Sequence, residues 1–436
     1  MSLLLDPVPG AVTTAPGTPG VPTDHPTTDL TYPTDQARPT EPTRPSEPTR
    51  ATDPTRASEQ DPQPGRRGSG GTRRNRWPRR TRLLVGLAAA WAGFLAAFLL
   101  LTGGYWWWRP VELAPPLVFA AVPALLLLLA PLARPVRGRL AAVAVCLVVV
   151  GLDLAGLNPA ALPGVGGATP APPGAVRVFA WNTEYWSDGD DPQRFYDYLA
   201  AQRADVYLLS EYVGWDLAGH RPVRVDHLAE LRRRFPDYQV VATGELLTMS
   251  RMPIRSTRLL DGWPYLTDPA RHGVPANSDF DDYYRHKVLR TDLTVDGRVL
   301  SVYNVHVPVQ LDISMDPTSA EFTEFMRAQQ DRRQAHYRAL RADLAANPHG
   351  RLIAGDFNAT SAMGELRELA AQVTDAARAS DTPYPVSWPD GDAPKWRLDW
   401  AFTDGPARTH DYRMVPADGM SDHRGQLLTV SVGQDG

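Results

Sequence analysis

Leu352–Asn358, with the sequence LIAGDFN, is the stretch that decides the fold expected for this chain. Its first three residues are apolar, follow a Pro-His-Gly turn and predict a short buried strand. Gly355 then lets the backbone leave the sheet, and Asp356 and Asn358 follow two residues apart. Because residues i and i+2 of an extended segment project to the same side, their side chains are expected to point together beyond the strand's carboxyl end. Sheet enzymes place reacting groups at such ends, although Asp-x-Asn after a strand is also a common turn.

An apolar segment accompanied by a group able to bind a metal ion or a phosphate occurs five more times after residue 175. The motifs are VFAWN ending at Asn182, VYLLSE ending at Glu211, VYNVH ending at His306, RLDW around Asp399, and SDH with Asp422 and His423. Together with GDFN, they occur in the order found in the endonuclease/exonuclease/phosphatase superfamily. The chain resembles this superfamily, whose fold is that of deoxyribonuclease I, over residues 176–432.

The resemblance implies an α/β (α+β) sandwich of two packed mixed sheets, with helices on both outer faces and the site at one end. The hydrophobic pattern allows this architecture without selecting it. Period-two alternation predicts strands at 238–242, 245–250, 286–295 and 298–306, the last two joined at an Asp-Gly turn. Helical spacing from Phe322 to Leu344 predicts one long amphipathic helix.

The implied activity is Mg²⁺-dependent hydrolysis of a phosphodiester, with Mn²⁺ as an alternative ion. Glu211 is the best candidate for direct ligation of the ion, because a hard cation prefers carboxylate oxygen. Asn182 and Asp422 are expected to complete its shell or to hold a second ion. Asp356 would orient or deprotonate the attacking water, and Asn358 would hold a phosphoryl oxygen. The predicted catalytic residues are His306, Asp356, Asn358, Asp399 and His423.

The two predicted catalytic histidines carry further expectations. His423, paired with Asp399, would stabilise the phosphorane or act as a base. A histidine at the position of His306 makes the chain resemble deoxyribonuclease I, the sphingomyelinases and several phosphoinositide phosphatases. The related apurinic endonucleases carry tyrosine at the corresponding position. In the first group a carboxylate orients this histidine. Asp281 and Asp282 are the nearest upstream candidates, and solvated loop positions are the alternative for both.

Composition divides the rest of the 436-residue chain. Residues 1–82 contain few apolar clusters, and a hexad that begins Glu/Asp-Pro-Thr-Arg occurs three times among them. They are expected to form a disordered cytoplasmic arm. The sequence does not identify a protein partner for this arm. Three apolar runs, 83–104, 113–133 and 140–157, predict transmembrane helices. A Pro/Gly-rich linker, 158–174, leads to the catalytic domain, 175–436. The one cysteine, Cys146, excludes an intrachain disulfide and is expected to be buried.

The arginine distribution predicts the orientation of this anchor. Eight arginines, between residues 66 and 82, lie close to the first run and three precede the third, whereas the first connector has only Arg109, offset by Glu112. Because positive residues mark the cytoplasmic side, the N-terminus is expected inside and the catalytic domain outside the cytoplasmic membrane.

The substrate stays open at this stage. Residues 175–436 carry 29 basic and 38 acidic residues, a formal charge of about −9 that disfavours tight binding of long nucleic acid. A phospholipid headgroup fits the anchor, and nucleic acid or a nucleotide fits the superfamily. The alternative from another class is a catalytically weak sensor that binds a phosphorylated ligand and signals to the cytoplasmic arm.

Overall fold

The computed structural model describes residues 77–187, 191–216, 221–275, 278–312, 315–391 and 395–433. All of them belong to one compact unit. The predicted arm, with its hexad repeats, lies outside the described residues except for residues 77–82, and the first helix already begins among these, at Arg79.

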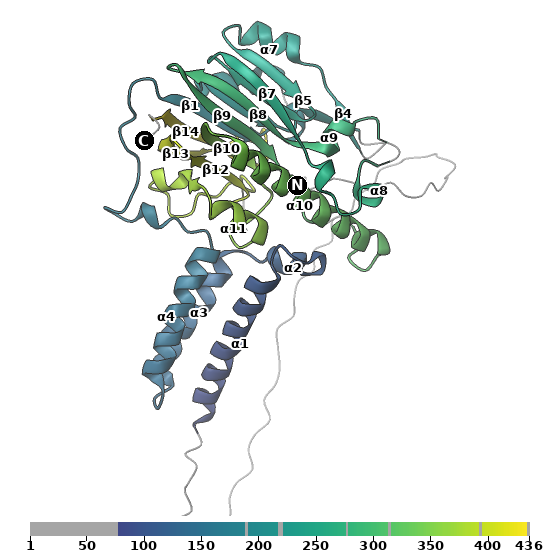
Figure 1. Cartoon of the computed structure of the whole chain (residues 1–436). Coiled ribbons are helices and arrows are strands. Elements are labelled where there is room, and N and C mark those ends of the chain that lie inside the picture. The colour runs from purple at the N-terminus through teal and green to yellow at the C-terminus, as the bar shows by residue number, and fades with distance from the viewer. Residues whose placement is uncertain are drawn as a thin grey trace, which may run out of the picture. The chain divides into compact units, whose positions relative to one another are not determined.

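Two six-stranded mixed sheets pack face to face, as expected (Figure 1). In spatial order the first sheet is β13 (Ala407–Val415), β14 (Gly425–Val432), β1 (Val176–Asn182), β2 (Val206–Ser210), β6 (Leu246–Ser250) and β5 (Gln239–Thr243). The second is β11 (Thr374–Asp375), β12 (Asp399–Asp404), β10 (Gly350–Asp356), β9 (Arg298–His306), β8 (His286–Val295) and β7 (Ile254–Asp261). The four strands predicted between residues 238 and 306 are confirmed to within a residue at each end.

Helices cover both outer faces of the sandwich. α6 (Pro192–Ala201) and α7 (Leu228–Arg234) pack on the first sheet, where Phe179 and Trp181 point outward. Val178 and Ala180, between them in sequence, point into the core that the two sheets share. α10 (Ala320–Ala346) and α11 (Gly364–Ala370) cover the second sheet, and α10 is the predicted long amphipathic helix.

Shorter elements fill the connections. They are η3 (Pro159–Ala161), α5 (Glu184–Ser187), β3 (Val213–Asp216), β4 (Arg221–Arg224), η4 (Trp263–Tyr265), α8 (Pro269–His272), α9 (Asp281–Arg285) and η5 (Ala376–Ala379). The linker residues 158–169 hydrogen-bond to the domain, for example from Asn158 to the carbonyl of Ala377 at 2.6 Å.

The strand register places three predicted site residues in one row. β10 pairs in parallel with β9 so that Asp356 lies opposite His306, and antiparallel with β12 so that it lies opposite Asp399. Gly355 permits this arrangement. Its φ is +144°, and a Cβ there would lie 2.0 Å from the carbonyl oxygen of Val305.

The predicted membrane anchor consists of α1 (Arg79–Leu101), η1 (Trp106–Trp108), α2 (Arg109–Glu112), α3 (Leu117–Leu129), η2 (Ala130–Leu132) and α4 (Arg137–Leu154). Among the described residues, α1 alone is a single helix long and apolar enough to cross a membrane; the pair Trp106–Glu112 and Leu117–Leu132, bent by 61°, would make a second if it acts as one span. Three separate spans are therefore not established. α3 begins only after Pro115 and Pro116 and, at 13 residues, is about 20 Å long, short of the roughly 30 Å of a bilayer core.

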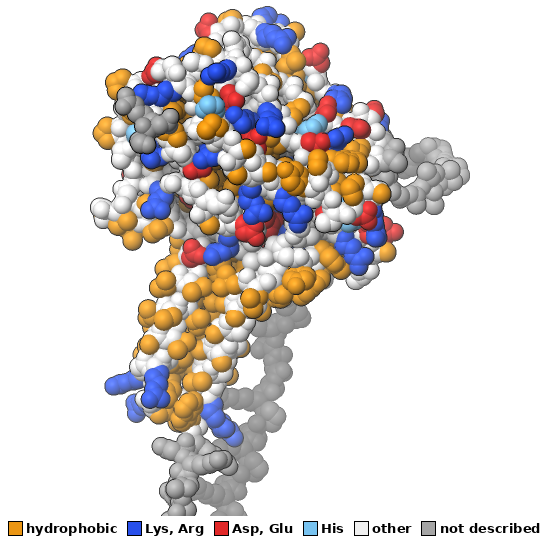
Figure 2. Space-filling model, in the orientation of Figure 1, with side chains coloured by type: hydrophobic (Ala, Val, Ile, Leu, Met, Phe, Trp, Pro, Cys, Tyr) orange, Lys and Arg blue, Asp and Glu red, His pale blue; other side chains and the backbone are white. Residues whose placement is uncertain are grey.

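The three longest anchor helices pack on one another at both ends. Leu84 of α1, Leu126 of α3 and Leu140 of α4 share one apolar cluster. Phe98, Phe119 and Leu154 of the same helices share another, together with Ala362 of the catalytic domain. On the face of the bundle that Figure 2 shows, apolar side chains predominate, and arginines gather at the end away from the domain. Cys146 is exposed on α4 rather than buried, since it lies on the outer face of this bundle.

Candidate functional site

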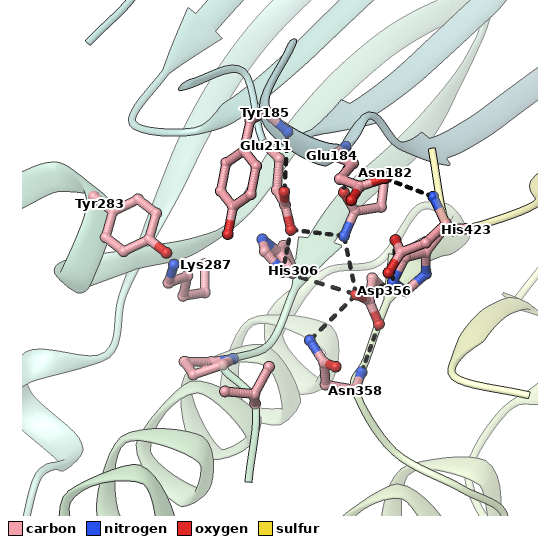
Figure 3. Close-up of a pocket in the computed structure, with 13 residues that line it drawn as sticks. Asn182, Glu184, Tyr185, Glu211, Tyr283, Lys287, His306, Asp356, Asn358 and His423 are labelled. Carbon is pink, nitrogen blue, oxygen red and sulfur yellow. Dashed lines mark hydrogen bonds and ion pairs between the residues drawn. The ribbon is translucent and has the colours of Figure 1, made fainter. Parts of the chain in front are cut away.

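All eight predicted site residues lie at one end of the sandwich, where the strands end. A pocket there, about 50 Å³ in volume, is lined by seven of them: Asn182, Glu211, His306, Asp356, Asn358, Asp422 and His423 (Figure 3). Asp399 lies behind His423 and contacts it. The structure thus brings together groups from six separate motifs.

Asn182 connects the two sheets at the centre of the pocket. Its side-chain nitrogen donates to Oε1 of Glu211 at 2.9 Å and to Oδ2 of Asp356 at 3.2 Å. The two carboxylates therefore converge on one amide group. Asn182 is itself held by its Oδ1, which accepts from the backbone nitrogen of Glu184 at 3.1 Å. In this orientation the amide nitrogen faces the pocket. Because an amide binds a metal ion through its oxygen, Asn182 could be a direct ligand only if its amide group rotated by half a turn.

Asp399 and His423 form the predicted pair. Nδ1 of His423 lies 2.7 Å from Oδ2 of Asp399, and both residues are buried. Burial alone would lower the pKa of His423, but the neighbouring Asp399 and Asp356 outweigh it and raise this pKa well above its ordinary value. The hydroxyl of Ser387 accepts from the backbone nitrogen of Asp399, at 2.9 Å, and fixes the start of β12. His423 is therefore held in one orientation as an imidazolium.

His306 has a different carboxylate partner from the one predicted. Its Nδ1 lies 2.9 Å from Oε2 of Glu245, at the start of the hairpin strand β6. Asp282 instead lies 3.2 Å from Nδ1 of His286, and Asp281 lies in the same short helix α9. Neither of the two upstream candidates is therefore the partner of His306, since Asp282 pairs with His286 and the carboxylate at Nδ1 of His306 is that of Glu245.

Glu245 also pairs with the ammonium of Lys287, which lines the pocket. Burial alone would lower the pKa of His306, but Glu245 outweighs it and raises this pKa to about 9. Glu245, despite complete burial, has a pKa below its usual value because His306 and Lys287 counteract the effect of burial. The pocket thus contains a third fixed cation that sequence motifs did not indicate. Lys287 is one of only two lysines in an arginine-rich chain, and this bias was the one available signal.

Asn358 contacts the protein with both of its amide hydrogens. Nδ2 donates to the carbonyl of Val307 at 3.0 Å and to Oδ2 of Asp356 at 3.2 Å, and its backbone nitrogen donates to Oδ1 of Asp356 at 2.7 Å. The predicted contact with a phosphoryl oxygen would require one of these bonds to exchange. Here the residue holds the carboxylate of Asp356 in place.

Several pocket residues have backbone conformations that ordinary residues avoid. Glu184, Tyr185, Glu211 and Asn358 all have positive φ, at 48°, 62°, 60° and 44°. Such conformations cost free energy and concentrate where a side chain must be aimed at a functional site. The turn that contains Glu184 and Tyr185 was not predicted to contribute to the pocket.

Carboxylates cluster on one side of the pocket. Burial raises the pKa of Glu211 and of Asp356, and burial with the nearby Asp422 raises that of Glu184 to about 7. Asp422 accepts from the indole nitrogen of Trp388 through Oδ2, at 2.8 Å. The carboxyl groups that line the pocket therefore outnumber its two imidazolium groups and one ammonium group.

The donor set fits a hard divalent cation. Oε1 of Glu211 and Oδ2 of Asp356 lie 3.7 and 3.8 Å from the same imidazole nitrogen, Nε2 of His306, and both accept from the side-chain nitrogen of Asn182. Ligand atoms of Asp356, Asp399 and His423 also lie within 4.8 Å of one another. In this second group, however, His423 and Asp399 already bond to each other. Carboxylate oxygens are what Mg²⁺ prefers, so Glu211 and Asp356 are the better ligands.

The sequence is similar to one protein family. The sequence signature of the Endonuclease/Exonuclease/phosphatase family matches residues 179–423. No curated protein matches the sequence closely enough to be compared. Among solved structures, humanized TDP2 from D. rerio is 18% identical, covers 59% of this chain and 100% of its own, and gives a TM-score of 0.39.

Two bacterial structures match in the same way. A family protein from Leptotrichia buccalis is 12% identical, with 59% of this chain and 100% of that chain covered and a TM-score of 0.43. Beta toxin from Staphylococcus aureus is 13% identical, with 58% and 99% covered and a TM-score of 0.39. At these identities the likeness concerns the fold alone. The family signature spans more than half of the chain and includes His306 and His423, so the chain belongs to the endonuclease/exonuclease/phosphatase family.

Proposed function

We propose that this protein is a membrane-anchored phosphodiester hydrolase that uses a divalent cation, Mg²⁺ in the first place, and acts outside the cytoplasmic membrane. One observation carries the proposal. The row His306, Asp356 and Asp399 across β9, β10 and β12 converges with Glu211 and His423 on a single pocket.

The cationic groups of the pocket suit the charge that develops on a phosphodiester. Attack on phosphorus produces a dianionic phosphorane, whose extra charge must be neutralised. His306 and His423 are both held protonated by buried carboxylates, and Lys287 adds a third positive charge. Because these groups are fixed before substrate binds, they stabilise the transition state without reorganisation.

Asp356 is the residue best placed to handle the attacking water. Its carboxylate is fixed by Asn182 and Asn358, and burial raises its pKa, so it can accept a proton from water. His423, which is held protonated and whose Nε2 lies 3.7 Å from Oδ2 of Asp356, can donate a proton to the leaving oxygen. A divalent cation held by Glu211 and Asp356 would supply Lewis-acid neutralisation of the phosphoryl oxygens.

The anchor supports a location outside the membrane. Arginines lie at one end of the helical bundle, in the first turn of α1 and around the start of α4, and Thr102 and Leu154 at the other end contact the catalytic domain. With the arginine end inside, the domain lies outside. This requires α1, the bent pair and α4 all to cross, which is part of the proposal.

We favour a phospholipid headgroup as the substrate over nucleic acid. The catalytic domain carries about −9 charges by sequence, whereas a protein that tracks long nucleic acid is usually basic. The connector beside the domain carries exposed Tyr105 and Trp107, side chains typical of a membrane interface. A tether of this kind keeps the site near lipid headgroups.

The experiment uses the full chain in lipid nanodiscs with bis(4-nitrophenyl) phosphate as a soluble phosphodiester. Hydrolysis should require Mg²⁺ or Mn²⁺ and stop with chelator. Labelled phospholipid vesicles and a DNA oligonucleotide, offered to the same preparation, separate the two substrate classes. Turnover of DNA but not of lipid would contradict the substrate assignment. Binding of a phosphorylated ligand without turnover of any substrate would replace the hydrolase with the sensor.

A further inference from the structure

A buried cluster of charges lies where the anchor meets the catalytic domain. Arg109 and Glu112, which the sequence presents as ordinary connector charges, are only 1% and 0% exposed. In the domain, Glu365 of α11 contacts Arg109, and Arg333 of α10 contacts Glu365; these two side chains are 6% and 0% exposed. Buried charges are costly unless they are paired and hydrogen-bonded, so four of them in one place demand a specific structural reason.

Arg109 joins the connector to both outer helices of the domain. Its Nη1 lies 2.7 Å from Oε2 of Glu112 and 2.7 Å from Oε1 of Glu365, and its Nε donates to the side-chain oxygen of Gln330 on α10. Burial alone would raise the pKa of Glu365, but Arg109 and Arg333 lower it to about 2. Glu365 is thus a carboxylate shared between one arginine of the anchor and one of the domain.

Arg333 carries the connection to the pocket. Its Nε and Nη2 lie 3.1 and 3.0 Å from the same oxygen of Glu365. Its Nη1 donates to the carbonyl of Pro308 and, at 3.4 Å, to that of Phe357. Pro308 lines the pocket two residues after His306, and Phe357 separates Asp356 from Asn358. One guanidinium therefore fixes the backbone after both strand ends that carry predicted catalytic groups.

The connector backbone fits closely against the same helices. The carbonyl of Gly103 accepts from the side chains of Gln330 and Gln334, at 2.8 and 2.7 Å. The hydroxyl of Thr102 accepts from the backbone nitrogen of Gly364 at 2.9 Å. A Cβ on Gly364 would lie 2.4 Å from the carbonyl oxygen of Thr102, so the two backbones touch. In the described residues, residues 102–112 are therefore part of the domain's packing.

We propose that Arg109 is a positioning residue of the catalytic pocket, acting through Glu365 and Arg333, so that full activity requires the connector to be docked on α10 and α11. The expected effect on kcat rests on the proposed function, whereas the expected effect on the backbone at the ends of β9 and β10 does not. Through these contacts the connector fixes the backbone at the ends of β9 and β10. A change that separates the connector from α10 and α11 therefore lowers turnover. Arg109 touches no pocket residue itself.

A second contact between anchor and domain provides a matched control. Nη1 of Arg367 on α11 lies 2.8 Å from Oδ2 of Asp153 at the end of α4, but these side chains are 35% and 68% exposed. Exposed pairs contribute little, whereas removing one partner of a buried network leaves the other charges uncompensated. Arg109→Gln and Arg367→Gln therefore make the same chemical change at one interface, with and without the connection to the pocket.

The test compares these two variants with the wild-type full chain in nanodiscs. Turnover of bis(4-nitrophenyl) phosphate gives kcat and KM, and hydrogen exchange is followed in the peptides spanning residues 303–310 and 355–360, well below the melting temperature. We expect Arg109→Gln to lower kcat by about tenfold to a hundredfold, because small misplacements of reacting groups cost that much. KM should change little, and both peptides should exchange faster. Arg367→Gln should stay within about twofold of wild type in kcat and leave the peptides unchanged.

Gln330→Met is the second variant, in case Arg109→Gln does not fold. This variant removes the hydrogen bonds of Gln330 to Arg109 and Gly103 and leaves no buried charge without its ionic partner. We expect a smaller decrease in kcat and a smaller increase in exchange than for Arg109→Gln. Folded variants with wild-type kcat and wild-type exchange would overturn the proposal, as would a lower melting temperature with no faster exchange at the two peptides. If the wild type turns over no phosphodiester, the proposed function fails, and the exchange data still decide whether Arg109 positions the strand ends.

Discussion

Oε2 of Glu245 lies 2.9 Å from Nδ1 of His306, and the pair joins the two sheets of the sandwich at the pocket. Glu245 directly precedes β6 in one sheet, and His306 ends β9 in the other. The carboxylate is completely buried and also binds Lys287, so it holds two of the three cations of the pocket. The orientation and charge of His306 therefore depend on a residue from the opposite sheet.

Glu245→Gln should remove the charge that keeps His306 protonated. The pKa of His306, now about 9, would fall, and the basic limb of the pH profile of kcat/KM would move to lower pH. We expect a loss of roughly 10² to 10³ in kcat/KM at pH 8 and a smaller loss at pH 6. Asp282→Asn is the control, since Asp282 pairs with His286 instead. Equal losses in both variants would contradict the assignment of Glu245.

The same pair has a consequence for stability. Because the pKa of His306 is raised above its ordinary 6.5, its pairing stabilises the fold fully below about pH 6.5, and this contribution is lost as the pH rises through about 9. The difference in melting temperature between wild type and Glu245→Gln should therefore be largest below neutral pH and shrink as the pH rises through 9, to the part that the pairing of Glu245 with Lys287 contributes.

Asp399 and His423 should act as one unit. Asp399→Asn removes the charge partner, and His423→Ala removes the imidazolium, each at a cost of roughly 10² to 10³ in kcat. The double variant should be little worse than the worse single one. Kinetics on a soluble phosphodiester, measured beside melting curves, test this. Losses that multiply independently would show that the contact of 2.7 Å has no catalytic consequence.

Gly355→Ala should be strongly destabilising. The new Cβ would lie 2.0 Å from the carbonyl oxygen of Val305, at a φ of +144° that side chains rarely adopt. We expect a loss of about 3 kcal/mol or more in the free energy of unfolding. Gly297→Ala, at a φ of +80° but with open space around the Cβ, separates the cost of the conformation from that of the clash. Chemical denaturation of the full chain measures both, and equal losses would contradict the close approach of β9 and β10.

Individual strands were predictable from their hydrophobic pattern and from the polar groups that follow them, whereas the two-sheet sandwich was expected from the family resemblance, because the pattern allowed this architecture without selecting it. The continuous apolar run from Val178 to Trp181 predicted a strand, and β1 is buried on both faces, as such a run indicates. Once those strands are aligned, β10 brings Asp356 beside His306 and Asp399, so seven of the eight predicted residues line one pocket. The long helix α10 was predictable from spacing alone.

The partners of these residues could not be predicted, since they depend on long-range contacts with no local pattern. Glu245 and Lys287 reach the pocket from a hairpin and from the start of β8. The orientation of the amide of Asn182 is set by Glu184, in a turn of positive φ that sequence periodicity does not reveal. The pairing of Arg109 with Glu365 joins segments 256 residues apart.

The proposed topology predicts where the C-terminus lies. A reporter fused after residue 436 should be active only if it functions outside the membrane, because arginines flank the opposite ends of the anchor helices. Alkaline phosphatase and green fluorescent protein fusions, compared in one host, measure this. Fluorescence with no phosphatase activity would place the domain inside and would mean that an even number of segments crosses.

The most direct test of the central claim is turnover of bis(4-nitrophenyl) phosphate by the full chain in nanodiscs, with and without chelator, for wild type and Glu211→Gln. Glu211→Gln keeps the shape of the side chain and removes one charge from the pair of carboxylates that faces His306. We predict that chelator abolishes wild-type turnover, that Mg²⁺ restores it, and that the variant needs more Mg²⁺ and turns over at least about tenfold more slowly. Wild-type turnover that persists in chelator, or a variant as active as wild type at the same Mg²⁺ concentration, would contradict the account.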